Sequence, residues 1–201
     1  MAKIKDIVNS AYFFWVLLAL PSFGMLAAFT NGQSPHALLH PTGEFAARFM
    51  ILAMMITPLR MLFPSHRWPF WLMRRRRYLG VAAFGYALLH TIFYLIDLGT
   101  LTNILSDALK PAIWTGWLAF FIFVPLALTS NDAAVRALKK LWKPLQRWVY
   151  AAAILTFAHW IFLEYELGPA LVHFLPLAAL ETYRIIRTRR AASTIANAQP
   201  M

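Results

Sequence analysis

Two histidines sit at matching positions inside two long apolar stretches of the chain. His90 lies 12 residues after Tyr78, and His159 lies 12 residues after Arg147. If both stretches are helices that enter a membrane from the same side, both imidazoles lie about 18 Å deep in a hydrocarbon core about 30 Å thick. An ionisable side chain at that depth is usually functional. Two imidazoles at one depth, on two helices, suit the axial ligands of a bis-histidine haem.

Small residues precede both histidines at helical spacing. The residues seven and three positions before each histidine are Ala83, Ala87, Ala152 and Thr156. These offsets place them on the helix faces that carry the imidazoles, which leaves room for a flat macrocycle. The alternative interpretation is structural, because either histidine could instead make an interhelical hydrogen bond.

The composition is that of an integral membrane protein. Of the 201 residues, 60% are hydrophobic and 13% are charged, whereas soluble domains carry about 25% charged residues. The net charge of +11 comes from basic residues that flank apolar blocks, so we expect a lipid bilayer and no nucleic acid as partner. The chain has no cysteine, which excludes disulfides, thiolate metal sites and cysteine ligands for an Fe–S cluster.

Six apolar blocks each approach the roughly 20 residues that span a bilayer. A lipid-exposed backbone must satisfy its hydrogen bonds internally, so the blocks predict an all-α integral membrane protein with a six-helix transmembrane bundle. The predicted spans are about 11–30, 45–63, 78–97, 112–129, 147–164 and 169–186. They form one haem-binding domain over residues 1–190, followed by a disordered cytoplasmic tail over residues 191–201. The first span lacks a cleavage site and is interpreted as an uncleaved helix.

The basic residues predict the orientation of these spans. With the N-terminus in the cytoplasm, 17 of the 19 lysines and arginines fall on the cytoplasmic side, and only Arg48 and Lys110 fall on the other. This asymmetry follows the positive-inside rule and places both termini in the cytoplasm. We therefore expect a multi-pass protein of a bacterial inner membrane, with both intramembrane histidines in its outer half.

Short polar segments connect the predicted spans. Residues 30–44 and 98–111 are predicted as outer loops, and residues 63–77 as an inner loop. Residues 130–143 predict a short helix on the inner surface, capped by the sequence Ser-Asn-Asp that begins at Ser130. An apolar stripe along this segment suits the membrane interface.

Three residues near the outer end of the second span are further candidates. Haem propionates favour basic or hydroxyl partners, and Arg48 and Thr42 could provide them, although Arg48 could equally be a snorkelling side chain. His40 begins the sequence HPTG. It is either a hydrated interface residue or part of a docking surface for an outer electron acceptor.

Four consecutive arginines, Arg74 to Arg77, precede the third span. The run is mainly a topology signal. It could also bind an anionic ligand, such as a flavin phosphate or a lipid headgroup, and Arg77 is our candidate for that role. The sequence contains no GxGxxG, P-loop, HExxH or nucleophile-elbow motif.

Several of these motifs, taken in order, resemble a known family. The sequence resembles the haem-binding membrane subunits of the periplasmic protein-methionine-sulfoxide reductase system, which belong to the ferric reductase-like transmembrane group. The similar stretches are RRRRYLG before His90, LALTSNDAAVRALKKLW, WVYAAAILTFAHW around His159, HPTG at residues 40–43 and ITPL at residues 56–59. The resemblance covers roughly residues 35–187.

The resemblance implies a b-type cytochrome. Such a protein takes electrons from a cytoplasmic flavin reductase or a quinol and passes them through haem b to a periplasmic molybdopterin-containing catalytic subunit, which reduces methionine sulfoxide in oxidised proteins. FMN and quinone are further candidate cofactors. His90 and His159 match the family's positions for haem and metal binding. The family usually has another histidine where this chain has Gln146; glutamine is a poor iron ligand, so we expect one haem.

We therefore interpret the chain as an electron-transfer subunit and not as the catalytic subunit of the reductase. One alternative is a stand-alone ferric or quinone reductase, which would reduce a ferric chelate without a partner. Another is a small membrane transporter or assembly factor with no redox group. Proton-coupled carriers often use intramembrane carboxylates, whereas Asp97 and Glu164 lie at the ends of predicted spans.

Overall fold

The computed structural model describes residues 6–7, 9–164 and 167–197, which form helices and turns and no strand. The all-α prediction is therefore confirmed for these residues. The six long helices are α2 (Ala11–Thr30), α3 (Pro35–Leu62), α4 (Arg67–Leu98), α6 (Pro111–Leu128), α9 (Val149–Glu164) and α10 (Leu167–Asn197). Four shorter elements join them: α5 (Leu101–Asp107), α7 (Asp132–Leu138), the 3₁₀ turn η1 (Lys139–Leu141) and α8 (Trp142–Gln146).

A helix covers each predicted span, but the helices differ in how well they suit a bilayer. Within the described part of the chain, α2, α3, α4 and α6 are long and apolar enough to cross a membrane. Helix α9 is apolar but shorter. The structure thus supports a multi-pass membrane protein, while the count of six spans and the cytoplasmic termini remain predictions.

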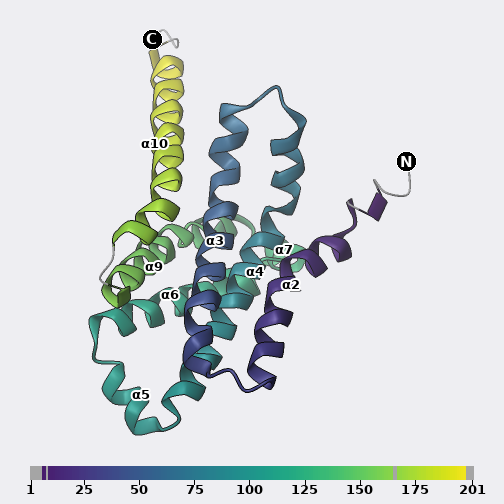
Figure 1. Ribbon diagram of the computed structural model, residues 1–201. Coiled ribbons are helices and arrows are strands. Elements are labelled where there is room, and N and C mark those ends of the chain that lie inside the picture. The colour runs from purple at the N-terminus through teal and green to yellow at the C-terminus, as the bar shows by residue number, and fades with distance from the viewer. Residues whose placement is uncertain (1–5, 8, 165–166, 198–201) are drawn as a thin grey trace.

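Two connections between long helices, together with α5 and the end of α10, mark two opposite sides of the molecule (Figure 1). In Figure 1 the α3–α4 turn and the end of α10 lie toward the top, whereas the α2–α3 turn and α5 lie at the bottom. We call the side with the α3–α4 turn the arginine end, because the run Arg74 to Arg77 lies near it, and the opposite side the α5 end. The predicted topology would place the arginine end in the cytoplasm.

Helix α3 begins ten residues earlier than the predicted span, so the loop predicted at residues 30–44 is wrong from residue 35 onward. The side chain of Ser34 accepts a hydrogen bond from the N–H of Ala37 at 3.3 Å, which satisfies one free donor of the first turn. Pro35 occupies the first turn, where the missing N–H costs nothing. The sequence HPTG at residues 40–43 is consequently helical.

The loops predicted at residues 63–77 and 98–111 are also shorter than expected. Helix α4 begins at Arg67, and Pro69 is tolerated there because it lies in the first turn. Helix α5 occupies half of the second segment, and the side chain of Thr100 caps it by accepting from the N–H of Asn103 at 3.3 Å.

Two further predictions concern the arginine end. The short helix predicted at residues 130–143 is confirmed in part: α7 covers residues 132–138, and the side chain of Asn131 caps it by accepting from the N–H of Ala134 at 2.8 Å. The rest of the segment forms η1 and the start of α8, and its position on the inner membrane surface remains a prediction. The sequence analysis predicts a disordered tail from residue 191 onward. In the structure, however, α10 continues to Asn197. Residues 191 and 192 are alanines, which favour continuation of the helix. Residues 198–201 lie outside the described part of the chain.

The core is built from two pairs of helices. Helix α3 packs most extensively against α4, and α6 packs most extensively against α9, while α10 covers α3 and α9. The two pairs meet in a cluster of buried side chains that includes Met50, Ala83, Phe123, Ala152 and Leu177. Small residues in this cluster let the helices approach closely, as is typical of membrane bundles.

Candidate cofactor site

A cavity of about 530 Å³ opens between the two helix pairs at the α5 end. Its volume falls in the range of about 300–1,000 Å³ that is usual for small-molecule and cofactor pockets. The walls come from α3, α4, α6 and α9 and are mainly apolar, and both intramembrane histidines line it. The cavity therefore has the size and the lining of a cofactor site.

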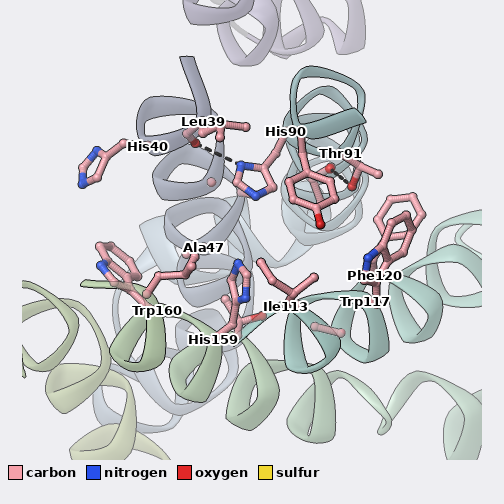
Figure 2. Close-up of a pocket in the computed structure, with 18 of the residues that line it drawn as sticks. Leu39, His40, Ala47, His90, Thr91, Ile113, Trp117, Phe120, His159 and Trp160 are labelled. Atoms are coloured by element: carbon pink, nitrogen blue, oxygen red, sulfur yellow. Dashed lines mark hydrogen bonds between the residues drawn. The ribbon is translucent and has the colours of Figure 1, made fainter. Parts of the chain in front are cut away.

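His90 on α4 and His159 on α9 face each other across this cavity. Figure 2 shows the two imidazoles pointing toward one another from opposite walls. Their ring centroids are 6.2 Å apart, and the ring planes are nearly perpendicular, at 88°. The sequence predicted that these two histidines would lie at one depth, and the structure brings them together.

The separation of the rings suits two ligands on one metal ion. An imidazole nitrogen binds a metal at about 2.0–2.1 Å, and the ring centroid lies about 1.1 Å behind it, so two imidazoles on opposite sides of one ion have centroids about 6.3 Å apart. The observed 6.2 Å matches that value. Among the described residues no three His, Cys, Asp or Glu side chains gather to hold a bare metal ion. A flat macrocycle would supply the four equatorial ligands that the two imidazoles leave open.

Hydrogen bonds fix which nitrogen of each ring faces the cavity. Nδ1 of His90 lies 3.0 Å from the carbonyl oxygen of Leu39, and Nδ1 of His159 lies 2.5 Å from the carbonyl oxygen of Ala112. A carbonyl can only accept, so Nδ1 carries the proton in both rings and Nε2 keeps its lone pair. That tautomer leaves both Nε2 atoms able to bind a metal.

The small residues predicted beside the histidines divide into two groups. Ala87 and Thr156, three residues before the histidines, line the cavity. Ala83 and Ala152, seven residues before them, are instead buried in the core between the helix pairs. The other small residues that line the cavity are glycines and alanines of α3 and α6: Gly43, Ala46, Ala47, Gly116 and Ala119.

Polar groups gather at the mouth of the cavity. Nδ1 of His36 lies 3.0 Å from a carboxylate oxygen of Asp97, and the hydroxyl of Tyr94 donates to Asp107 at 2.9 Å. Asp107 also forms an ion pair with Lys110. The hydrogen bond from Lys110 lowers the pKa of the Asp107 carboxyl. The mouth therefore combines carboxylates with basic and hydroxyl groups, above an apolar interior.

Of the three candidates near the outer end of the second predicted span, Thr42 and Arg48 lie outside the cavity lining, whereas His40 belongs to it. Thr42 is fully buried and lies behind His90, with its hydroxyl 3.3 Å from Nδ1 of that ring. Arg48 donates to Nε2 of His173 at 3.1 Å and forms an ion pair with Glu44. Contacts with propionates remain a prediction for both residues. His40 lines the cavity, and in Figure 2 it lies apart from the two facing rings.

Arg77 belongs to the opposite end of the molecule. Its guanidinium donates to Asp132 at 2.6 Å, which ties α4 to the start of α7. The contact lowers the pKa of the Asp132 carboxyl. The predicted role of Arg77 in anion binding therefore concerns a separate place on the arginine end, and it remains a prediction.

Sequence reasoning missed one feature of the site, the pair Thr115-Gly116 on α6. Gly116 lines the cavity beside His159. A signal for it was available, because a Thr-Gly dipeptide precedes each histidine at a similar distance, 47 residues before His90 and 43 residues before His159. Thr42-Gly43 was predicted in an outer loop and Thr115-Gly116 in a span, so the relation between the two dipeptides became visible only in the fold.

A much smaller cavity of about 60 Å³ lies deeper, toward the arginine end, and Gln146 lines it. The side-chain amide of Gln146 donates to the carbonyl oxygen of Leu126 and to the hydroxyl of Thr129, both at 3.1 Å. Each water in the liquid takes up about 30 Å³, so this space holds at most a few waters and no macrocycle. This smaller cavity also lies between the two helix pairs, since residues of α3, α4, α6 and α8 line it.

Comparison with known families agrees with this architecture. Residues 42–157 match the family described as "Ferric reductase like transmembrane component". The chain belongs to the ferric reductase-like transmembrane family. The matched region of this ferric reductase-like chain includes His90 and both Thr-Gly pairs, and it ends two residues before His159.

Individual relatives of this ferric reductase-like protein are similar over most of its length. It is 39% identical to the protein-methionine-sulfoxide reductase heme-binding subunit MsrQ of Azospira oryzae, over 79% of this chain and 70% of the relative. It is 36% identical to the protein of the same name from Brucella ovis, over 76% of this chain and 71% of the relative. No solved structure matches the chain.

Proposed function

We propose that this protein is the haem-binding membrane subunit of a protein-methionine-sulfoxide reductase system and that it transfers electrons. The observation that carries the proposal is the pair of facing imidazoles, 6.2 Å apart, in a cavity large enough for a cofactor. The names of the two relatives, which are heme-binding subunits of such a reductase, support the same conclusion.

His90 and His159 would hold haem b through their Nε2 atoms. Bound there, the haem supplies an iron that exchanges one electron between its ferric and ferrous states. The protein's own part is to keep both imidazoles neutral and fixed, through their bonds to Leu39 and Ala112. The apolar walls exclude water and lower the local dielectric, which tunes the reduction potential.

The direction of electron transfer follows from the predicted topology. The cavity is at the α5 end, which the positive-inside rule places on the outer side of a bacterial inner membrane. We propose that electrons enter from a cytoplasmic flavin reductase, FMN or a quinol at the arginine end. They would leave through the α5 end to a periplasmic molybdopterin-containing catalytic subunit, which repairs methionine sulfoxide in oxidised proteins.

We also propose that this chain carries one haem. At the arginine end Gln146 fills the position below His159 and is engaged in two hydrogen bonds within a cavity of about 60 Å³. That space has no imidazole and is too small for a macrocycle. The inner part of the electron path therefore requires a flavin or a quinol as its carrier.

Optical spectroscopy of the purified full-length protein tests the proposal. Reduced with dithionite, the protein should show the spectrum of a low-spin haem at one haem per chain. Either substitution, His90→Ala or His159→Ala, should abolish that low-spin spectrum, because one axial ligand is lost. His66→Ala is the matched control and should keep the spectrum, because His66 lies in the α3–α4 turn, away from the cavity.

Two results would contradict the proposal in different ways. A low-spin spectrum that persists in both the His90→Ala and His159→Ala proteins would remove the ligand assignment. A wild-type protein that is purified without haem and cannot be reconstituted with it would remove the electron-transfer function and favour a transporter or assembly factor. Reduction of a ferric chelate without any partner subunit would instead indicate a stand-alone reductase.

A further inference from the structure

A Thr-Gly pair on α3 lies directly against His90. The carbonyl oxygen of Leu39 is 3.0 Å from Nδ1 of His90 (Figure 2). The hydroxyl of Thr42 shares its one proton between this oxygen, at 3.0 Å, and the carbonyl oxygen of Leu38, at 2.6 Å. Gly43 is the next residue, and a Cβ atom on it would lie 3.2 Å from Cε1 and Nδ1 of the imidazole. The carbonyl of Leu39 thus holds the ring of His90, and the ring lies close to the backbone of Gly43.

The same arrangement recurs on α6, around His159. The carbonyl oxygen of Ala112 is 2.5 Å from Nδ1 of His159. The hydroxyl of Thr115 shares its one proton between this oxygen, at 2.8 Å, and the carbonyl oxygen of Pro111, at 2.9 Å. A Cβ atom on Gly116 would lie 2.7 Å from Cε1 and Nδ1 of the ring. The spacing along the helix is identical to that on α3, since the carbonyl comes three residues before the threonine and four before the glycine.

No requirement of backbone conformation accounts for these two glycines. Both lie inside helices, where glycine costs about 1 kcal/mol relative to alanine. The chain has eight glycines, and only Gly43 and Gly116 would bring a Cβ atom within 3.4 Å of another group. In both cases that group is the imidazole of a cavity histidine. The missing side chains are therefore explained by the space that the rings need.

We propose that Thr42-Gly43 and Thr115-Gly116 are two matched positioning pairs for the imidazoles. The glycine leaves space for the imidazole ring. The carbonyl one turn earlier accepts the hydrogen bond from Nδ1 and so keeps the proton on that nitrogen. The threonine hydroxyl, which bonds the same carbonyl, controls the strength of this hydrogen bond. This inference deepens the proposed function and rests on haem binding by His90 and His159. It assigns Thr42 a place behind the ligand, in addition to the predicted contact with a propionate.

The threonine hydroxyls have a predictable effect on the reduction potential. A carbonyl oxygen that accepts from two donors gives less electron density to each, so the hydroxyl weakens the bond from Nδ1. A weaker bond leaves the imidazole less anionic, and a less anionic ligand favours ferrous over ferric iron. Each hydroxyl thus raises the midpoint potential, and its removal should shift the potential to more negative values. The shift should be larger for Thr115 than for Thr42, because the shorter hydrogen bond of Thr42 goes to Leu38 and not to Leu39.

Alanine substitutions test the glycines. Gly116→Ala should lower the affinity for haem about 10–100-fold, as removal of outer-shell support at metal sites commonly does, and the remaining haem should show a high-spin signal. Gly43→Ala should show a smaller loss, because its Cβ atom would sit 3.2 Å and not 2.7 Å from the ring. Gly85→Ala, on the same helix as His90 but with nothing within 4 Å of the added atom, is the control and should match wild type.

Threonine substitutions test the hydroxyls. Thr115→Val and Thr42→Val keep the shape of the side chain and remove the donor, so the low-spin spectrum should persist while the midpoint potential becomes more negative. Thr115→Ser and Thr42→Ser restore the donor and should restore the potential. Thr188→Val is the control, since the hydroxyl of Thr188 also bonds a carbonyl of its own helix, that of Arg184 at 2.8 Å, remote from the cavity.

The possible outcomes separate the inference from the proposed function. If wild type binds haem but the Gly116→Ala spectrum and affinity equal those of Gly85→Ala, the glycine assignment is overturned and the haem ligands stand. If Gly116→Ala fails to fold, the threonine series decides, and a potential unchanged in Thr42→Val and Thr115→Val overturns the inference. A wild-type protein that binds no haem overturns both.

Discussion

Both cavity imidazoles donate to a backbone carbonyl and not to a carboxylate. A carboxylate partner would draw the proton from Nδ1 and give the ring more anionic character, which would favour ferric iron. The carbonyls of Leu39 and Ala112 are weaker acceptors, so both rings stay close to neutral. Because each acceptor is a main-chain carbonyl, substitution of Leu39 or Ala112 does not remove it. The strength of the hydrogen bond from Nδ1 can instead be changed by substitution of the neighbouring threonine.

The ion pair at the mouth of the cavity gives a pH-dependent contribution to stability. The hydrogen bond from Lys110 lowers the pKa of Asp107 below its ordinary 3.8. A carboxyl with a depressed folded-state pKa stabilises the fold above its unfolded pKa, and the contribution is lost as the pH falls through the folded value. Because the Lys110 side chain is 68% exposed, we expect less than about 1 kcal/mol.

Asp107→Asn should therefore be slightly less stable than wild type at about pH 7, and the difference should shrink as the pH falls below the ordinary carboxyl pKa of 3.8 and through the lowered folded-state pKa of Asp107. Thermal unfolding of both detergent-purified proteins across this range measures the effect. A difference that stays constant over the whole range would show that the charge of Asp107 plays no part.

The helices themselves were largely predictable, whereas their ends were not. Each apolar block became a helix because a chain in lipid must bond its own backbone, and the cap at Asn131 was correctly predicted from residue type. The start of α3 was missed because Pro41 and Gly43 read as a turn. Gly43 is in fact part of a helix. A side chain is absent at this position because the ring of His90, 47 residues away in the chain, needs the space. Such a reason lies in the tertiary contact and not in the local sequence.

In the candidate site, too, some residues could be predicted from the sequence and others could not. The two histidines could be found from their depth alone, because an imidazole inside an apolar helix is conspicuous. Their carbonyl acceptors could not, because every residue has a carbonyl and only the helix packing selects Leu39 and Ala112. The role of Thr42 behind the ring depends on the same packing.

The hydrogen bonds from Gln146 of α8 to Leu126 and Thr129 close the space between the helix pairs at the arginine end. They lead to a prediction for Gln146. Gln146→His would supply an imidazole at the position where the similar family usually has one. We expect the ratio of haem to protein to stay at one, because the cavity there is about 60 Å³ and an added ligand does not enlarge it. Haem and protein assays of the purified variant decide the matter; a ratio of two would show that the helices can part to admit a second macrocycle.

At the scale of the whole molecule, the orientation can be tested without background labelling, because the chain has no cysteine. We expect Asn103→Cys, in α5, to react with a membrane-impermeant maleimide applied to the outer face of the inner membrane. Ser65→Cys, in the α3–α4 turn, should react only after the membrane is permeabilised. The opposite pattern would invert the predicted topology and place the large cavity on the cytoplasmic side.

The two helix pairs each contribute one imidazole, one carbonyl and one glycine to the cavity, so neither pair contains a complete site. During biosynthesis the α3–α4 pair emerges from the ribosome well before residue 159 does. The proposed haem could consequently be held from both sides only after α9 has been inserted. Its retention would thereby depend on insertion of the second helix pair, and a product truncated before α9 would lack one of the two imidazoles.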